Sequence, residues 1–390
     1  MKNYILSDAG LHKNLLPITF TRPVSEIRSG ILTNTQRWQH FLGEKCSFLT
    51  EIYLQKKFPA STGQANIWIN GGVVADKHIA ERVLNLQQGS LMCNGVLIAA
   101  VCVGTPPVIF DNYPEPVQVY DGNVIVIQQV YDIFGLAAKC IDIDFELLAG
   151  GRVSNKLSKT NTVIGDNPVF LEEGAIAEAS VFNTTNGPIY LGKHCEVMEG
   201  SMIRGPFCLL DHSVLKMGAK IYGPTIIGPH SKIGGELNNV VILGLSNKAH
   251  DGFLGNSVIG EWCNLGADTN NSNLKNNYAM VKLWNYEKKS FLNTGLQFCG
   301  LIMGDHSKCG INTMFNTGTV VGVSANIFGS GFPRNYIPSF SWGGASGFVQ
   351  FGYEKAIEVA GLVMKRRNME LDNTEKEIFK YLFDNNDHKF

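Results

Sequence analysis

An aliphatic residue that recurs every six positions constrains this sequence more than any other feature. From residue 191 the position is aliphatic eight times without a slip, at Leu191, Val197, Ile203, Leu209, Leu215, Ile221, Ile227 and Ile233. The same period precedes and follows this run, at Ile164, Phe170, Ile176, Phe182, Met303, Cys309, Phe315, Val321 and Ile327. Such a period predicts a left-handed parallel β-helix, in which three short strands form each coil and the aliphatic side chains point inward. The alternative, an irregular glycine-rich sandwich, does not produce so regular a register.

A smaller α/β domain is expected in front of the β-helix. Three apolar runs, at residues 4–6, 65–70 and 95–103, are typical of buried strands. A helical pattern from Tyr131 to Leu148 ends at Gly150. We therefore place an α/β domain at residues 1–150, the β-helix at 151–350 and a helical segment at 351–390. The last segment has two amphipathic stretches that we expect to cap the solenoid, with the basic run 365–367 facing solvent.

Composition limits the partners that this protein can have. Its formal net charge of −1 gives no long-range field to attract nucleic acid or an anionic membrane, so an anionic ligand must be bound by local groups. No apolar run is long enough for a membrane span or a signal peptide. The nine cysteines lie mostly at apolar positions without a CxxC pair, which is typical of reduced, buried thiols. We expect a cytoplasmic protein with no nucleic-acid or membrane partner.

Asp8 and two arginines are candidate ligand-binding residues of the front domain. Asp8 follows the first strand, and open α/β sheets bind ligands at the carboxyl ends of their strands. Pro23 is expected to start a helix, which would place Arg22 and Arg28 beside its positive end. Guanidinium groups at a helix start match phosphate oxygens. The alternative is that both arginines are solvated or pair with Glu26.

The six-residue period fails between Ile233 and Met303. Residues 236–253 are expected to loop out, and residues 269–293 form a polar excursion that contains seven asparagines. Insertions in a solenoid tend to lie on its binding face. Because asparagine both donates and accepts hydrogen bonds, this excursion suits the hydroxyl groups of a sugar; a solvated loop is the alternative.

His250, at the edge of this interruption, is the candidate catalytic base. Asp251 follows it and can orient a ring nitrogen, and no cysteine or histidine stands near it at the spacing of a metal site. Histidine exchanges protons near neutral pH and can accept one from an ammonium nucleophile. A single histidine in a loop is by default a surface residue, but its place in the interruption favours the catalytic role. His212, His230 and His306 lie within the repeat and are expected at coil corners.

Two segments carry a resemblance to a known family. NKAHDGFLG, residues 247–255, resembles a KAGHxxYLG segment, and CNLGADTNNSN, residues 263–273, resembles NIGAGTxxxN. Both patterns belong to the acetyltransferase domain of the bifunctional enzymes of UDP-N-acetylglucosamine synthesis, which combine glucosamine-1-phosphate acetyltransferase with N-acetylglucosamine-1-phosphate uridyltransferase. The resemblance implies that His250 is the general base that deprotonates the 2-amino group as it attacks the thioester of acetyl-CoA. It also implies substrate contacts from Asn264, Asn273, Lys248, Lys216 in place of a phosphate-binding arginine, and Phe253 in place of a tyrosine.

The front half is similar to a shortened nucleotidyltransferase domain of a bacterial branch of the same family. ILSDAG, residues 5–10, stands where that domain begins its nucleotide loop. The resemblance implies a role for Mg²⁺ and nucleotide contacts from Asp8 and Asn70, to which the position of Arg22 and Arg28 described above adds two candidate contacts. The family's glycine-rich run is absent, and Asn70 stands where the family has a metal-binding aspartate, which leaves Asp8 or Asp76 as substitutes. Without such a carboxylate the transfer loses its main charge stabiliser, and the sequence does not identify the metal ligands.

The sequence thus predicts a homotrimeric sugar-phosphate enzyme, since the flat faces of a solenoid are usually buried by self-association. Acetyl transfer from acetyl-CoA to glucosamine-1-phosphate or a related amino sugar is the expected reaction. Nucleotidyl transfer to the sugar 1-phosphate is expected as a second activity, of the front domain. Two rivals remain: a nucleotidyltransferase whose β-helix only holds the trimer together, and a non-catalytic sugar-nucleotide sensor.

Overall fold

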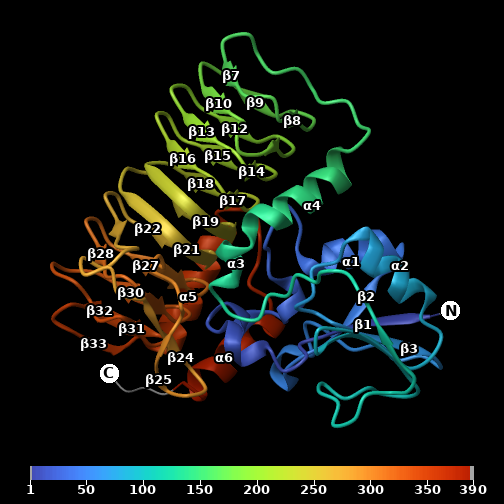
Figure 1. Ribbon diagram of the computed structural model, residues 1–390. Coiled ribbons are helices and arrows are strands. Elements are labelled where there is room, and N and C mark those ends of the chain that lie inside the picture. Colours follow the sequence, from blue (N-terminus) through green and yellow to red (C-terminus); the bar gives the residue numbers. More distant parts are fainter. Residues whose placement is uncertain (1, 387–390) are drawn as a thin grey trace. The chain divides into compact units, whose positions relative to one another are not determined.

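The chain consists of two compact units, whose elements are labelled in Figure 1. The computed structural model describes residues 2–386. Unit 1 comprises Met1–Arg28 and Leu32–Gln129, and unit 2 comprises Ser29–Ile31 and Val130–Phe390. The division falls before Gly150 because helices α3 (Asp132–Gly135) and α4 (Ala137–Ala149) contact the strands of unit 2.

A mixed six-stranded sheet forms the centre of unit 1, in the order β2-β1-β3-β5-β4-β6. Its strands are β1 (Asn3–Ser7), β2 (Cys46–Leu49), β3 (Asn66–Asn70), β4 (Ser90–Cys93), β5 (Val96–Cys102) and β6 (Val117–Val119). β1 is parallel to both β2 and β3, whereas β5 is antiparallel to β3 and β4. Helices α1 (Asn34–Leu42) and α2 (Lys77–Asn85) bury Trp38 and Ile79 in one core with Leu6 and Ile69 of the sheet. The three expected strands and the α/β class are confirmed.

The first helix of unit 1 begins later than the sequence predicts. Around Pro23 the chain forms the 3₁₀ turns Ile18–Thr21 and Val24–Glu26, with further 3₁₀ turns at His12–Leu15 and Ile52–Leu54. Helix α1 begins only at Asn34, where Thr33 and Gln36 form a capping box that satisfies backbone N–H groups of the first turn. The expectation that Arg22 and Arg28 flank a helix start is therefore wrong.

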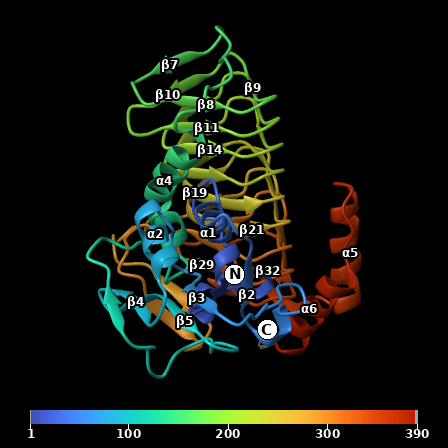
Figure 2. The ribbon, with the colours of Figure 1, turned by 90° about the vertical axis from the view of Figure 1, so that its right-hand side faces the viewer.

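Unit 2 is a parallel β-solenoid, and Figure 2 shows its strands stacked coil upon coil. One sheet of thirteen strands and one of ten run through the stack. Neighbouring coils pair in parallel, whereas β24–β25 and β32–β33 are antiparallel hairpins. The strands are β7 (Thr162–Ile164), β8 (Val169–Leu171), β9 (Ile176–Ala177), β10 (Val181–Asn183), β11 (Ile189–Leu191), β12 (Glu196–Val197), β13 (Met202–Arg204), β14 (Phe207–Leu209), β15 (Val214–Leu215), β16 (Lys220–Tyr222), β17 (Thr225–Ile227), β18 (Lys232–Ile233), β19 (Glu236–Gly244), β20 (Asn247–Lys248), β21 (Phe253–Glu261), β22 (Asn264–Leu265), β23 (Asn270–Asn271), β24 (Lys282–Asn285), β25 (Ser290–Asn293), β26 (Leu301–Met303), β27 (Lys308–Cys309), β28 (Met314–Phe315), β29 (Thr319–Val321), β30 (Asn326–Ile327), β31 (Tyr336–Ile337), β32 (Ser341–Gly344) and β33 (Gly347–Gln350).

The six-residue period sets the register of the coils. Leu191 lies opposite Leu209, and Leu209 lies opposite Ile227, so one coil takes 18 residues. These side chains are fully buried in one continuous core, where each contributes about 1.5–3 kcal/mol of stability. His212, His230 and His306 occupy turns with φ angles of +58°, +57° and +59°, as expected for coil corners.

Residues 236–253 stay within the coils, and the expectation that they loop out is wrong. They form β19, β20 and the start of β21, and Ile242 lies opposite both Ile227 and Ile259. The coil between Ile227 and Ile242 is therefore 15 residues long instead of 18, which breaks the six-residue count without breaking the stack. The true excursion follows β23 and forms the hairpin β24–β25, after which Met303 pairs with Ile259.

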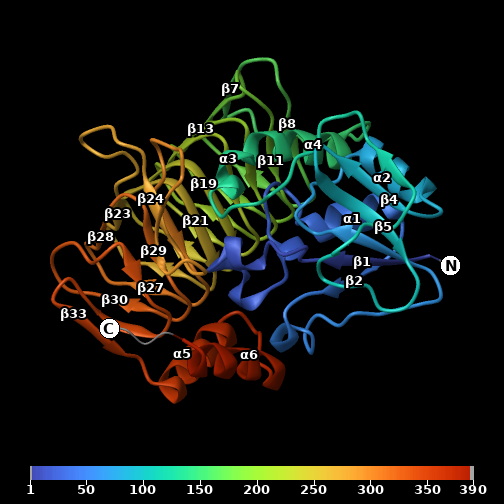
Figure 3. The same cartoon turned by 60° about the horizontal axis from the view of Figure 1, so that its bottom comes forward.

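Two C-terminal helices, α5 (Tyr353–Lys365) and α6 (Asn373–Asp384), pack side by side (Figure 3). Phe379 of α6 meets the His306 ring edge-on, at 5.1 Å between centroids. Beyond α5, Arg367 donates a hydrogen bond to the carbonyl oxygen of His230, several coils earlier in the stack. The helices thus return along the side of the solenoid, so the expectation that they cap its end is wrong. Within residues 2–386 no helix is long and apolar enough to cross a membrane.

Candidate active site

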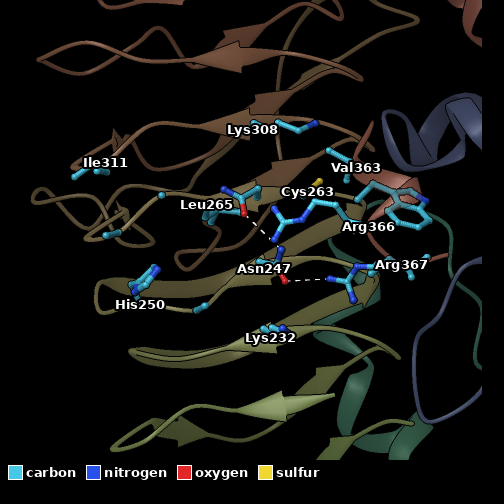
Figure 4. A pocket seen from close by; sticks show the side chains of 16 residues that line it. Lys232, Asn247, His250, Cys263, Leu265, Lys308, Ile311, Val363, Arg366 and Arg367 are labelled. Atoms are coloured by element: carbon cyan, nitrogen blue, oxygen red, sulfur yellow. Dashed lines mark hydrogen bonds between the residues drawn. The ribbon is translucent and has the colours of Figure 1, made fainter. Parts of the chain in front are cut away.

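A ladder of outward-facing polar side chains forms the floor of a groove in unit 2. Lys232 lies opposite Asn247, Asn247 opposite Asn264, and Asn264 opposite Lys308, each one strand further along the ten-stranded sheet. Each directly precedes an inward-facing residue, and alternation along a strand turns it outward. Lys232 and Lys308 were not predicted from the sequence as groove residues. Their position directly before an inward-facing residue of the repeat could have indicated that they face outward. The groove has a volume of about 720 Å³ (Figure 4).

The segment at the end of α5 completes the groove with two arginines. Arg366 and Arg367 line it together with Val363. Figure 4 shows the hydrogen bond of 3.1 Å that Arg367 donates to the side-chain oxygen of Asn247. The expectation that the basic run faces solvent is thus wrong for Arg367, which is partly buried, whereas Arg366 lines the groove and is exposed, and Lys365 is exposed and does not line the groove. Burial, and then the charge of Arg366, lower the pKa of Arg367.

The groove is strongly cationic although the whole chain is nearly neutral. Lys232, Lys308, Arg366 and Arg367 line it, and among its lining residues in the described part of the chain none is acidic. Burial lowers the pKa of Lys308, whose ammonium donates to the carbonyl oxygen of His306 at 2.8 Å. Lys308 and Arg367 are partly buried, whereas Lys232 and Arg366 are exposed. Cations gathered in a groove without an acidic neighbour attract anions, and arginine in particular matches phosphate oxygens. The groove is therefore suited to a ligand that carries phosphate groups.

His250 lies on a turn that joins the groove to the next face of the solenoid. The turn, residues 249–252, connects β20 of the groove sheet to β21 of the thirteen-stranded sheet. The His250 side chain is exposed and lines the groove, at the end away from Arg367 in Figure 4. Within residues 2–386 no hydrogen bond joins the ring to Asp251, so the expectation that Asp251 orients it is not met. The ring is thus exposed at this corner and lines the groove.

Phe253 and Asn273 meet on the face beyond this corner. A Cβ atom placed on Gly255 would lie 2.6 Å from the Phe253 ring and 2.7 Å from Nδ2 of Asn273, so both side chains cover this glycine. Nδ2 of Asn273 donates to Oδ1 of Asn256 at 2.8 Å. Asn264 lies in the groove on the other side of His250, where Nδ2 of Asn247 donates to it at 3.5 Å. The two asparagines expected at one sugar site are therefore separated by the His250 corner.

The two lysines expected to bind substrate lie away from these surfaces. Lys248 is 1% exposed inside the coil, and its ammonium donates to the carbonyl oxygens of His250 at 2.7 Å and Asp251 at 3.0 Å. Burial lowers the pKa of Lys248 to about 8. Lys216 lies one coil before Gly234, and its ammonium points to the sulfur of Met198 at 3.7 Å. Neither lysine lines the groove.

In unit 1 the expected nucleotide-binding residues are engaged within the fold. Asp8 is buried and accepts hydrogen bonds from the backbone N–H of Val24 at 2.8 Å and the hydroxyl of Thr50 at 2.5 Å. Its carboxylate also lies 3.1 Å from Nδ1 of His12. The remaining contacts of the set are Arg22 to the Ile18 carbonyl at 2.8 Å, Asn70 to the Leu97 carbonyl at 3.2 Å, and a backbone bridge from Arg28 to Thr33. Asp8, Arg22 and Asn70 thus each make a side-chain hydrogen bond within unit 1.

The carboxylates expected to hold Mg²⁺ have structural roles as well. Asp76 caps helix α2 by accepting the Ile79 N–H at 2.8 Å, and Asp8 bridges three segments of unit 1. Within residues 2–386, no three His, Cys, Asp or Glu side chains gather into a metal site. Mg²⁺ at nucleotide sites is usually bound by one or two carboxylates together with the phosphates of the substrate. The two candidate carboxylates, Asp8 and Asp76, each already accept a backbone N–H.

Comparisons with known proteins cover both units in part. Residues 4–153 match the sugar nucleotidyl transferase family model. A bifunctional sugar-1-phosphate nucleotidylyltransferase/acetyltransferase from Sulfurisphaera tokodaii is 31% identical over 165 residues, which are 42% of this chain and 40% of that relative. The chain thus spans about two fifths of the length of this curated relative. A solved structure of Arabidopsis UDP-N-acetylglucosamine acyltransferase is 16% identical, with a TM-score of 0.22 over 55% of this chain and 80% of that one.

Proposed function

We propose that unit 2 transfers an acetyl group from acetyl-CoA to the amino group of a sugar phosphate. The observation that carries this proposal is the position of His250, on the corner between the cationic groove and the surface formed by Phe253 and Asn273. A base at that corner can reach ligands on two faces at once. Acetyl transfer needs this arrangement, because the coenzyme and the amine must meet beside one proton acceptor.

Each surface has a separate task in this mechanism. The lysines and arginines of the groove bind the phosphates of the coenzyme, and Asn264 and Asn247 offer amides to its pantetheine arm. His250 removes a proton from the amine as the nitrogen attacks the thioester carbonyl. The carbon–sulfur bond then breaks, the thiol leaves with a proton returned to sulfur, and the amide is the second product. Asn273 binds a sugar hydroxyl, while Phe253 packs on the sugar ring without donating a hydrogen bond.

The test of this function is the release of free thiol from acetyl-CoA by the purified full chain. Glucosamine-1-phosphate should support thiol release and formation of its N-acetyl product, detected by mass spectrometry. Glucosamine-6-phosphate and unphosphorylated glucosamine define how the acceptor is selected. The proposal fails if none of these amines increases thiol release above the rate of acetyl-CoA alone.

Neutralising the groove should weaken coenzyme binding with little effect on the chemical step. Arg366→Gln and Arg367→Gln should each raise KM for acetyl-CoA about tenfold, which corresponds to a charge-assisted hydrogen bond of about 1.5 kcal/mol. Steady-state kinetics at varied acetyl-CoA measure this change. Lys365→Gln is the matched control, because it removes the same charge from an exposed side chain outside the groove. Equal KM values in all three variants would contradict coenzyme binding here.

A second activity, nucleotidyl transfer to a sugar 1-phosphate, is proposed for unit 1. It is favoured by the match of residues 4–153 to the sugar nucleotidyl transferase model. Pyrophosphate release from each nucleoside triphosphate with N-acetylglucosamine-1-phosphate tests it. If pyrophosphate is released but no thiol, unit 2 is a platform for unit 1; if neither is released, a sugar-nucleotide sensor is favoured.

Self-association into a homotrimer is part of the same proposal. Exposed apolar side chains on the outside of the coils support it: Ile176 is 55% exposed, Met202 62% and Met217 70%. Exposed apolar groups of this kind are candidates for burial between subunits. Sedimentation equilibrium of the full chain gives the mass of the assembly directly. A monomer would contradict the proposed trimer and would mean that a single chain supplies every residue of the site around His250.

A further inference from the structure

We propose that Lys248 is a positioning residue that holds the His250 turn, residues 249–252, in place from inside the coil. The assignment rests on the proposed role of His250 in acetyl transfer. Lys248 occupies an inward position, opposite Ile233, and the same column holds Leu215 and Val197 in earlier coils. An aliphatic residue is the rule in this column, so a buried lysine needs a reason other than packing.

The hydrogen bonds of Lys248 supply that reason. Its side chain starts inside the coil and turns forward, so that Nζ donates to the carbonyl oxygens of His250 at 2.7 Å and Asp251 at 3.0 Å. The backbone N–H of Asp268, in the next coil, also donates to the Asp251 oxygen at 3.0 Å. The His250 carbonyl oxygen thus accepts from the Lys248 ammonium, whereas the Asp251 carbonyl oxygen accepts from both Lys248 and the Asp268 N–H. A buried cation is tolerated when such carbonyl groups surround it.

Close packing on both sides of the turn makes its position sensitive to this contact. A Cβ atom on Gly235, in the coil before, would lie 2.6 Å from the Gly252 oxygen and 2.9 Å from the His250 oxygen. Gly252 has φ +115° and would clash at 2.2 Å with the Thr269 oxygen of the coil after. The turn is therefore fixed from below, from above and, through Lys248, from within. Removing the inner contact leaves the His250 carbonyl free to rotate and moves the ring with it.

A positioning role predicts that catalysis and stability respond differently to Lys248→Met. Methionine fills a similar volume without a charge, so the melting temperature should be unchanged or higher. The rate constant kcat for acetyl transfer should fall about 10- to 100-fold, because a misplacement of about 1 Å can cost about 10²-fold. KM for acetyl-CoA should stay within about twofold, because the groove cations are untouched. Ile233→Met, one coil earlier in the same column, is the matched control and should keep the wild-type kcat.

Hydrogen–deuterium exchange separates this proposal from the proposed function. In Lys248→Met, the peptide that covers residues 249–255 and the amide of Asp268 should exchange about tenfold faster, whether or not the protein proves to be an acetyltransferase. Unchanged exchange with unchanged kcat would overturn the assignment. So would a Lys248→Met protein that fails to fold or melts well below Ile233→Met, since that result makes the lysine part of the core. If exchange accelerates but thiol release is absent in the wild type, the positioning contact stands and acetyl transfer fails.

Discussion

Replacing His250 by alanine is expected to lower kcat for acetyl transfer by about 10²- to 10⁴-fold, the range that general-base catalysis contributes. The side chain is exposed, so its loss removes a proton acceptor without opening a cavity in the core. Stability should therefore stay within about 0.5 kcal/mol of the wild type, as for other surface changes. Thiol release at saturating acetyl-CoA and amino sugar phosphate measures the loss.

His212→Ala is the control for this experiment, because His212 is an exposed corner histidine that does not line the groove. It should retain the wild-type rate. A wild-type rate in His250→Ala would remove the histidine from the mechanism. Equal losses in both variants would instead indicate general damage to the coil corners.

Replacing Asp8 by alanine is expected to destabilise unit 1 by about 3–5 kcal/mol, the cost of breaking a buried charged contact from one side. The change leaves the buried Val24 N–H, the Thr50 hydroxyl and His12 without the carboxylate that they face. Domains are stable by only about 5–15 kcal/mol, so a large part of the stability of unit 1 would be lost. Differential scanning calorimetry of the full chain should show a much earlier first transition.

Asp76→Ala provides the comparison for Asp8. That variant loses a helix N-cap, which should cost about 1 kcal/mol, although both carboxylates are equal candidates for a metal ligand in the sequence. If Asp8→Ala melts like the wild type and yet loses pyrophosphate release, Asp8 faces the nucleotide. The structural account of its three partners would then be wrong.

The coil architecture is predictable from the sequence because its determinants are local. Leu191, Leu209 and Ile227 each indicate an inward-facing position, and their spacing alone predicts the register in which the strands pair. The prediction fails where the count changes. The 15-residue coil that ends at Ile242 keeps its inward-facing residues, but their spacing differs from six. A search for the six-residue period therefore assigns this coil to a loop.

The parts of the site that sequence cannot supply depend on distant segments. Arg367 reaches Asn247 across 120 positions of the chain, and no local pattern distinguishes it from its solvated neighbour Lys365. Lys248 resembles a ligand-binding residue because lysine is rarely buried, and only the pairing with Ile233 turns it inward. Asp8 likewise follows a strand end, as a binding residue would, but its partners at Val24 and Thr50 come from other segments.

The ladder from Lys232 to Lys308 makes the solenoid a ruler. Lys232 and Lys308 lie on strands of the ten-stranded sheet that are separated by three strand-to-strand intervals. Because neighbouring strands are spaced by about 4.8 Å, the backbone holds the two lysine Cα atoms about 14 Å apart. A substitution can remove one of these charged side chains but cannot change the distance between them, because the backbone sets that distance. Selection for a longer or shorter ligand would therefore have to proceed in increments of a whole coil.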